Sequence, residues 1–185
     1  MNSASTLPMF ELFADPVGEK IFVKQVNACG FCSKARGWLY VGPHYGPGGG
    51  DDLAICPWCI HDGIAAAQGI TFNDSTIYPD FPSAKQMSSE DKALVEERTP
   101  GFETWQGNHW LMCCGRACVY LGEADSTDLL GRWSSAVASL FEDEPDWSAA
   151  EKADLVAHVR KGAGPCAYVF QCRICSQLKG FWDIH

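Results

Sequence analysis

Closely spaced cysteines are the residues of this chain whose type and spacing could do chemistry. Eight of its ten cysteines form four pairs, Cys29/Cys32, Cys56/Cys59, Cys114/Cys118 and Cys172/Cys175. Two or three intervening residues let both thiolates of a pair bind one tetrahedral ion, and two such pairs complete a closed zinc site with four cysteine ligands. The sequence therefore predicts two structural zinc ions.

Neighbouring pairs are expected to share a metal. The first ion would be bound by Cys29, Cys32, Cys56 and Cys59, and the second by Cys114, Cys118, Cys172 and Cys175. A cross-braced arrangement, in which alternate pairs share an ion, stays open. Of the two remaining cysteines, Cys113 could replace Cys114 as a ligand, and Cys166 is expected to be a buried, unreactive thiol. His61 is a further alternative ligand for the first ion.

Short strands are predicted to position these pairs. An apolar run at residues 20–26 leads into the first pair, and residues 38–41 are expected to return beside it as the second strand of a hairpin. Residues 119–122 are predicted to form a strand that leaves the third pair. Residues 168–171 should form a strand that enters the fourth pair, with a last strand at 181–182.

Four helical segments are predicted between the strands. The first spans residues 61–68, and the second opens at Ser88 and stops at Thr99-Pro100. Apolar residues at helical spacing predict a third helix at 129–141. Ser148 and Glu151 match the capping-box pattern, which predicts a fourth helix ending near Arg160. The last two helices would form an acidic helical hairpin inserted at residues 125–162.

These elements predict an α+β fold with small zinc-ribbon-like β elements around the two four-cysteine sites. Residues 1–85 would form the N-terminal zinc-binding half, and residues 86–185 the C-terminal half with its helical insertion. The two halves could also make one domain, since 185 residues suffice for a single hydrophobic core.

Acidic residues dominate the charge of the chain. With 23 Asp and Glu against 14 Lys and Arg, the formal net charge is −9, which argues against nucleic acid as a partner. The acids concentrate between residues 121 and 155. That segment could be only a solvated surface, or it could steer a basic partner. The residues predicted to contact such a partner are Glu123, Asp125, Asp128, Glu142, Asp143, Glu144, Asp146 and Trp147. Trp147 could instead be a hydrophobic staple for the following helix.

Nothing in the sequence predicts an enzyme. A closed four-cysteine site lacks the open position that a catalytic zinc needs, and the five histidines match no zinc-protease or deaminase pattern. No phosphate-binding loop or nucleophile elbow is present. The chain also has neither an N-terminal secretion signal nor a continuous apolar run of membrane-spanning length. We therefore expect a cytoplasmic protein in which the cysteines are reduced.

Several short motifs are similar to those of one known family. They are Cys56-Pro57-Trp58-Cys59, Phe72-Asn73-Asp74, Arg98-Thr99-Pro100-Gly101-Phe102, and Trp110 followed by Cys114-x-x-x-Cys118. This combination resembles the CbrC family of bacterial cysteine-rich proteins, named for colicin tolerance. The resemblance implies immunity or tolerance to an antibacterial toxin, including nuclease effectors of contact-dependent and type VI secretion systems. The implied partner is a cognate protein toxin, a basic nuclease whose substrate-binding face the acidic segment would occlude.

Two other functions stay open at this point. A zinc-ribbon adaptor could bind nucleic acid or a protein complex, although the acidity of the chain argues against the first. A redox or zinc-buffer protein could use the many thiols directly.

Overall fold

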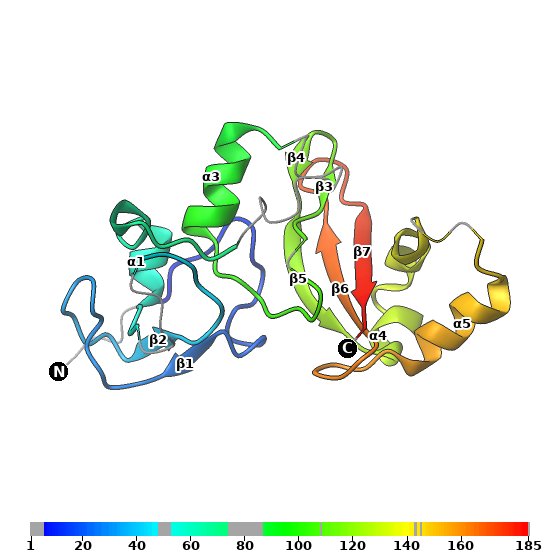
Figure 1. Cartoon of the computed structure of the whole chain (residues 1–185), viewed down its shortest axis with the longest axis horizontal. Coiled ribbons are helices and arrows are strands. Elements are labelled where there is room, and N and C mark those ends of the chain that lie inside the picture. Colours follow the sequence, from blue (N-terminus) through cyan, green and yellow to red (C-terminus); the bar gives the residue numbers. More distant parts are fainter. Residues whose placement is uncertain are drawn as a thin grey trace. The chain divides into compact units, whose positions relative to one another are not determined.

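Two units make up the chain, Met1–Glu103 and Thr104–His185. The computed structural model describes residues 6–47, 53–73, 87–107, 109–142, 144 and 146–184. Each unit combines small antiparallel sheets with short helices, as Figure 1 shows, so the predicted α+β class is confirmed. The division follows Glu103 instead of the predicted residue 85, which places one more helix in the first unit.

A two-stranded hairpin carries the first cysteine pair in unit 1. Strands β1 (Phe22–Lys24) and β2 (Trp38–Tyr40) pair antiparallel, with Phe22 opposite Tyr40. The backbone N–H of Tyr40 donates to the carbonyl of Ile55 at 2.8 Å, which fixes the second cysteine pair beside β2. The hairpin predicted around the first pair is therefore confirmed.

Helix α1 (Pro57–His61) starts inside the second cysteine pair, and a 3-10 turn, η1 (Ala66–Gln68), follows it. The prediction of one helix over residues 61–68 was therefore wrong. Proline favours the first turn of a helix because its fixed φ suits that position and no N–H is needed there. Gly63 then adopts a φ of +73°, a left-handed conformation that ends the helix.

Helix α3 (Ser89–Arg98) lies where the sequence predicts it. The Ser88 hydroxyl accepts the N–H of Asp91 at 3.1 Å and caps its first turn. At the other end, the Asn73 side-chain amide donates to the carbonyls of Val95 and Thr99, at 2.8 and 3.0 Å. These bonds attach α3 to unit 1. The core of this unit includes the fully buried Leu12, Phe13, Phe22, Ile55, Ile60, Phe72 and Val95.

Unit 2 is built on an antiparallel sheet of β5 (Val119–Ala124), β6 (Cys166–Gln171) and β7 (Leu178–Asp183), in that order. The central strand β6 is buried at its first five positions, which is expected of a strand covered on both faces. One face is aromatic: Phe170 packs against Trp110, Tyr120 and Phe181 with ring centroids 5.2 to 6.1 Å apart.

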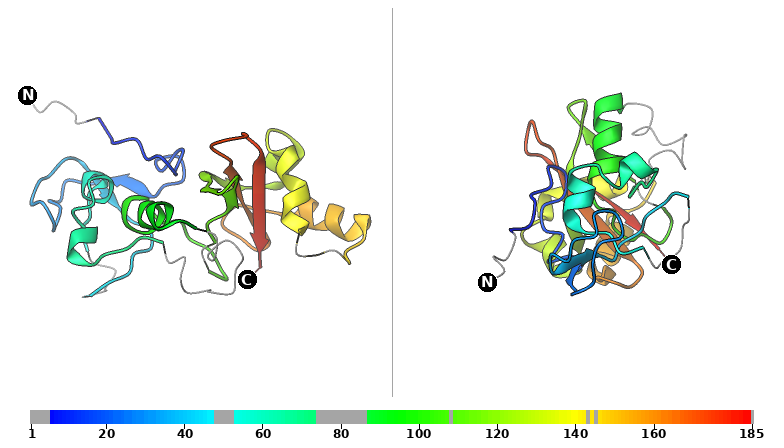
Figure 2. Two further views of the ribbon diagram at one scale, coloured as in Figure 1. Left: turned by 90° about the horizontal axis from the view of Figure 1, so that it is seen from above. Right: turned by 90° about the vertical axis from the view of Figure 1, so that its left-hand side faces the viewer.

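Three helical segments cover the other face of this sheet: α4 (Ser126–Leu130), η2 (Ser134–Phe141) and α5 (Ala149–His158). Figure 2 shows η2 alongside β7, where the N–H of Gly180 donates to the Ser139 hydroxyl at 2.7 Å. A side chain at Gly180 would come within 2.8 Å of Leu140, so the close approach requires glycine. The shared core contains Ala124, Leu129, Trp133, Ala136, Leu140, Phe141, Val156, Val159, Ala167 and Val169.

The single helix predicted for residues 129–141 is replaced by two separate elements. An Asp125–Asp128 capping box starts α4 earlier than predicted. The Asp128 carbonyl then accepts the N–H groups of both Gly131 and Trp133, at 3.3 and 2.9 Å, which turns the chain before η2. The capping box predicted at Ser148 is confirmed, and α5 ends at His158, two residues before the predicted end.

Candidate metal centres

Four cysteines of unit 1 converge on one point. Cys29, Cys32, Cys56 and Cys59 form a group whose sulfur atoms all lie within 4.8 Å of one another. The Sγ atoms of Cys29 and Cys59 are 3.6 Å apart, and those of Cys32 and Cys56 are 3.8 Å apart. Four thiolates bound tetrahedrally at ~2.3 Å from zinc would be separated by about 3.8 Å. The group therefore has the dimensions of a metal site, with the membership that the sequence predicts.

Unit 2 contains a second group with the same dimensions but different members. It consists of Cys113, Cys114, Cys172 and Cys175, again with all sulfur atoms within 4.8 Å. The Sγ of Cys113 lies 3.7 Å from that of Cys175 and 3.9 Å from that of Cys114. Both groups join neighbouring pairs along the chain, so the cross-braced alternative does not apply to them.

Cys113 occupies the place in this group that the sequence predicts for Cys118. Strands β3 (Met112–Cys113) and β4 (Arg116–Ala117) form a tight hairpin with Cys114 and Gly115 at its tip, at φ of +51° and +74°. Two positive φ angles are typical of a two-residue hairpin turn. The turn directs Cys113 and Cys114 to the same end, whereas Cys118 lies beyond β4 and is fully buried. The predicted Cys114/Cys118 pair therefore does not form one half of the group.

Two of the three C-x-x-C segments, Cys29–Cys32 and Cys172–Cys175, share one backbone turn. Ser33 and Ser176, which follow the segments, have φ of +57° and +59°. Each donates its N–H to the carbonyl of the first cysteine, Cys29 or Cys172, at 2.8 and 3.1 Å. In both segments, backbone N–H groups also point at the sulfur of the first cysteine: Cys56 N–H at Cys29, and the N–H groups of Ile174 and Cys175 at Cys172.

Backbone N–H groups also set the charge of these first cysteines. Burial alone would raise the pKa of Cys29, but N–H donors near its sulfur outweigh it and lower the pKa to about 7. The same balance lowers the pKa of Cys172 to about 6. Burial and neighbouring thiols raise the pKa of Cys59 and Cys113 instead. Cys29 and Cys172 therefore favour the thiolate form, and a bound dication would favour the thiolate form of Cys59 and Cys113 as well.

The remaining cysteines lie outside both groups. Cys166 is fully buried, as predicted, and its Sγ is 2.6 Å from a carboxylate oxygen of Asp183 and 3.2 Å from the Tyr168 hydroxyl. Asp183 also accepts the N–H of Trp105 at 2.9 Å, so this carboxylate attaches the first segment of unit 2 to β7. No local sequence pattern indicates this cluster, because its members are far apart in the chain.

Three of the acids predicted to contact a partner bond within unit 2. Glu123 accepts the N–H of Gly162 at 2.8 Å, and Asp125 caps helix α4. Asp128 binds Arg132 and Lys161, with both N–O distances 2.7 Å. Charge counting could not reveal these partners. The hydrogen bonds and ion pairs of these three acids stabilise unit 2, so their carboxylates are less available to a partner.

The other predicted contacts lie near the start of α5. Glu142 and Asp146 are exposed, Glu144 is half-buried, and Asp143 lies outside the described residues. Glu142 is 3.4 Å from Lys179 across the surface. The Trp147 ring packs against Phe141 and Trp182 with centroids 5.9 and 5.5 Å apart, so it belongs mainly to the core. These two contacts are with η2 and β7, so the alternative in which Trp147 is a hydrophobic staple for the following helix stays a prediction.

Replacing Asp128 with asparagine should destabilise unit 2 by about 1–2 kcal/mol at pH 7. Burial alone would raise the pKa of Asp128, but hydrogen bonds from Arg132 and Lys161 outweigh it and lower the pKa below its ordinary 3.8. A lowered folded-state pKa stabilises the fold above pH 3.8, and this contribution is lost as the pH falls through the folded-state value.

Urea unfolding at several pH values measures this effect. The difference between wild type and Asp128→Asn should be constant from pH 7 to 5 and shrink below about pH 4. Asp154→Asn is the control, because the Asp154 side chain is 77% exposed and should contribute almost nothing. A difference that grows on acidification would contradict the assigned ion pairs.

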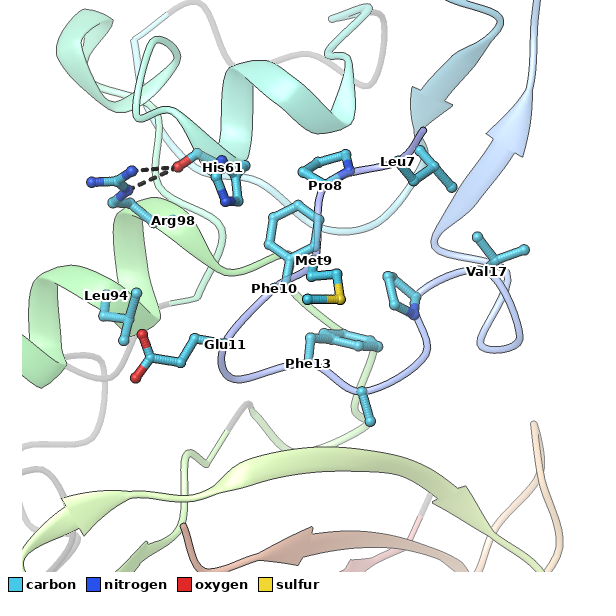
Figure 3. Close-up of a pocket in the computed structure, with 12 residues that line it drawn as sticks. Leu7, Pro8, Met9, Phe10, Glu11, Phe13, Val17, His61, Leu94 and Arg98 are labelled. Atoms are coloured by element: carbon cyan, nitrogen blue, oxygen red, sulfur yellow. Dashed lines mark hydrogen bonds between the residues drawn. The ribbon is translucent and has the colours of Figure 1, made fainter. Parts of the chain in front are cut away.

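Unit 1 also contains a groove of about 740 Å³, shown in Figure 3. Its lining consists of Leu7, Pro8, Met9, Phe10, Glu11, Phe13, Ala14, Pro16, Val17, His61, Leu94 and Arg98. The guanidinium of Arg98 donates two hydrogen bonds to the His61 carbonyl, at 2.9 and 2.7 Å. The His61 ring Nδ1 is 2.8 Å from Asp62, and His61 is not part of the four-thiol group. The lining is mainly apolar and includes no serine, cysteine or lysine.

Comparison with known proteins places the chain in a family. The family model described as "Uncharacterised protein family (UPF0167)" matches residues 7–184. The chain belongs to the UPF0167 family. It is 34% identical to the UPF0167 protein PA1536 of Pseudomonas aeruginosa over 92% of this chain and 93% of that protein. It is 33% identical to the UPF0167 protein Mb2317 of Mycobacterium bovis, over 98% and 96%. No solved structure matches the chain.

Membership of UPF0167 corrects the resemblance drawn from short motifs. The CbrC assignment was wrong, because the family model and the relatives are all UPF0167. Toxin immunity was implied only by that resemblance, so it stays a prediction without a test. Among the helices in the described part of this UPF0167 protein, none has the length and apolar composition to cross a membrane.

Proposed function

We propose that the protein is a non-enzymatic binding protein in which each unit is held together by one structural zinc ion. The observation that supports this is the pair of four-thiol groups, each with the dimensions of a tetrahedral site. Four thiolates are the ligand set typical of structural zinc and leave no position for a substrate or an activated water. The zinc-ribbon description of the small hairpins belongs to the same proposal.

The partner that suits this protein best is a basic protein. Two bound zinc ions with four thiolates each would add four negative charges to the formal −9 of the chain. On unit 2, three acids are exposed: Glu142 and Asp146 precede α5, and Asp154 lies within it. Exposed charges of one sign raise the rate at which an oppositely charged partner associates.

Nucleic acid suits the surface of unit 1 less well. The Lys24 ammonium lies over the Trp38 ring at 5.7 Å, and the Arg36 guanidinium lies over Trp58 at 4.8 Å. A base that stacked on either indole would have to displace a cation that already covers it. If the protein is a zinc-ribbon adaptor, these contacts therefore favour a protein complex over nucleic acid as its partner.

A matched pair of variants tests the acidic surface. Glu142→Gln with Asp146→Asn removes two charges beside α5, and Glu97→Gln with Glu103→Gln removes two exposed charges from unit 1. Both double variants have the same net charge. Affinity capture from the native host with wild type and both variants should identify a basic protein that only the first variant fails to retain.

The purified partner should then bind the first variant about fivefold more weakly, as two exposed ion pairs of ~0.5 kcal/mol each predict. Binding of the wild type should weaken as salt is raised, and the unit 1 variant should match the wild type. Equal affinity of both variants would refute the acidic contact. Tight binding of a single-stranded or duplex oligonucleotide by the wild type would favour the nucleic-acid adaptor instead.

A further inference from the structure

The two thiol groups differ in how far solvent reaches their sulfur atoms. In unit 1, Cys29, Cys56 and Cys59 are buried and only Cys32 is partly accessible. In unit 2, Cys114 and Cys175 are exposed. The four-thiol group of unit 1 is therefore largely protected from solvent, whereas that of unit 2 is open to it. Oxidants must contact the sulfur atom, so access decides which group reacts.

Geometry selects the cysteines that could form a disulfide in the open group. The Sγ atoms of Cys113 and Cys175 are 3.7 Å apart, and 62 positions separate the two residues in the chain. Cys114 is exposed but adjacent to Cys113, and a disulfide between neighbours closes a strained ring. Cys172 is the buried member of the group, with its sulfur at 3.4 Å from the N–H groups of Ile174 and Cys175. Cys175 is therefore an accessible thiol, and Cys113, whose sulfur lies 3.7 Å from it, is a partner from another segment.

We propose that the unit 2 group is an oxidative modification site, at which a hydroperoxide converts Cys113 and Cys175 to a disulfide and releases the metal. This inference rests on the proposed zinc binding, and it assigns the site a reactivity that the unit 1 group lacks.

The reaction proceeds in two balanced steps. The Cys175 sulfur attacks the hydroperoxide, an S–O bond forms, the O–O bond breaks, and the hydroperoxide is reduced to an alcohol or water. Cys175 is now a sulfenic acid, oxidised by two electrons. The Cys113 thiolate attacks that sulfur, an S–S bond forms, and hydroxide leaves as water after protonation. Zinc loses two of its four ligands and dissociates.

Loss of this metal would remove one connection between two parts of unit 2. The β3–β4 hairpin contributes Cys113 and Cys114, and the turn between β6 and β7 contributes Cys172 and Cys175. The disulfide keeps one covalent link between them but no longer holds Cys114. The tip of the hairpin should therefore be the segment that changes on oxidation.

The experiment uses the whole zinc-loaded protein, in which the unit 1 group is the internal control. Metal content is measured first and should be two zinc ions per chain. Hydrogen peroxide in small excess should then release one of the two, detected with a chromogenic chelator. Peptide mass mapping after alkylation should find a Cys113–Cys175 disulfide, with all four unit 1 cysteines still alkylated as free thiols. Dithiothreitol with added zinc should restore the second ion.

Each result bears on a different part of the proposal. Release of both ions together, or a first disulfide within the unit 1 group, would overturn the selectivity. Persistence of both ions with no disulfide would overturn the modification site. A protein isolated without metal would refute the zinc proposal, while disulfide mapping of that same sample would still decide whether Cys113 and Cys175 react first. Cys118→Ser is the matched variant and should respond as the wild type does, because Cys118 is outside the group.

Discussion

Replacing Cys59 with serine should release one of the two zinc ions and unfold unit 1. Cys59 is fully buried, and its sulfur lies 3.6 Å from that of Cys29. Serine would leave three sulfur ligands around a hydroxyl that binds zinc poorly. Structural zinc contributes ~10–16 kcal/mol of apparent binding free energy, which is about the whole stability of a typical domain at 5–15 kcal/mol.

Metal analysis and hydrogen exchange would show this loss. Zinc should fall from two ions to one per chain, and protection should disappear from β1, β2 and α1 while the unit 2 sheet keeps it. Cys166→Ser is the control, because it also changes a fully buried cysteine but one outside both groups. That variant should keep both ions. A Cys59→Ser protein with two zinc ions and a protected β1–β2 hairpin would show that the unit 1 group is not a structural site.

Local chemistry explains what the sequence could predict. A C-x-x-C segment, the serine that caps α3 and the Ser148–Glu151 capping box each depend on atoms three residues apart. Such patterns fix the local geometry, so the grouping of four cysteines in unit 1 and two helix starts were predicted correctly. The strands around the first pair were predictable for the same reason, since a hairpin must return the chain to its start.

Long-range contacts explain what the sequence could not predict. The Asn73 amide bonds to carbonyls at the end of α3 and attaches this helix to unit 1, and spacing does not reveal that contact. The acidic segment is a second example. Counting charges treats Asp128 and Asp146 alike, yet Asp128 is bonded to two cations and Asp146 is exposed.

The four-thiol group of unit 2 shows how one turn changes which cysteines come together. The run Cys113-Cys114-Gly115-Arg116-Ala117-Cys118 offers three cysteines for two places, and spacing alone favours Cys114 and Cys118. Two-residue hairpin turns usually begin with asparagine, aspartate or glycine, so a turn at Cys114-Gly115 gives a weak signal. Because that turn forms, both adjacent cysteines face the C-x-x-C segment.

Cys113→Ser should therefore lose the second zinc ion, whereas Cys118→Ser should keep it. Cys113→Ser removes a sulfur that lies 3.7 Å from Cys175, so this variant should bind one zinc ion per chain instead of two. The β3–β4 hairpin should lose hydrogen-exchange protection, because a two-stranded hairpin is marginally stable alone. Cys118→Ser should keep both ions, with a cost of about 1–3 kcal/mol for a hydroxyl placed in a buried apolar position.

Zinc content, measured on both variants after identical purification, decides between the two ligand sets. Loss of the ion from Cys118→Ser with retention in Cys113→Ser would restore the set predicted from spacing and would refute the turn at Cys114-Gly115. The position of Cys118 argues for retention of both ions in Cys118→Ser, because this side chain is fully buried beyond β4 and is not one of the four cysteines whose sulfur atoms converge.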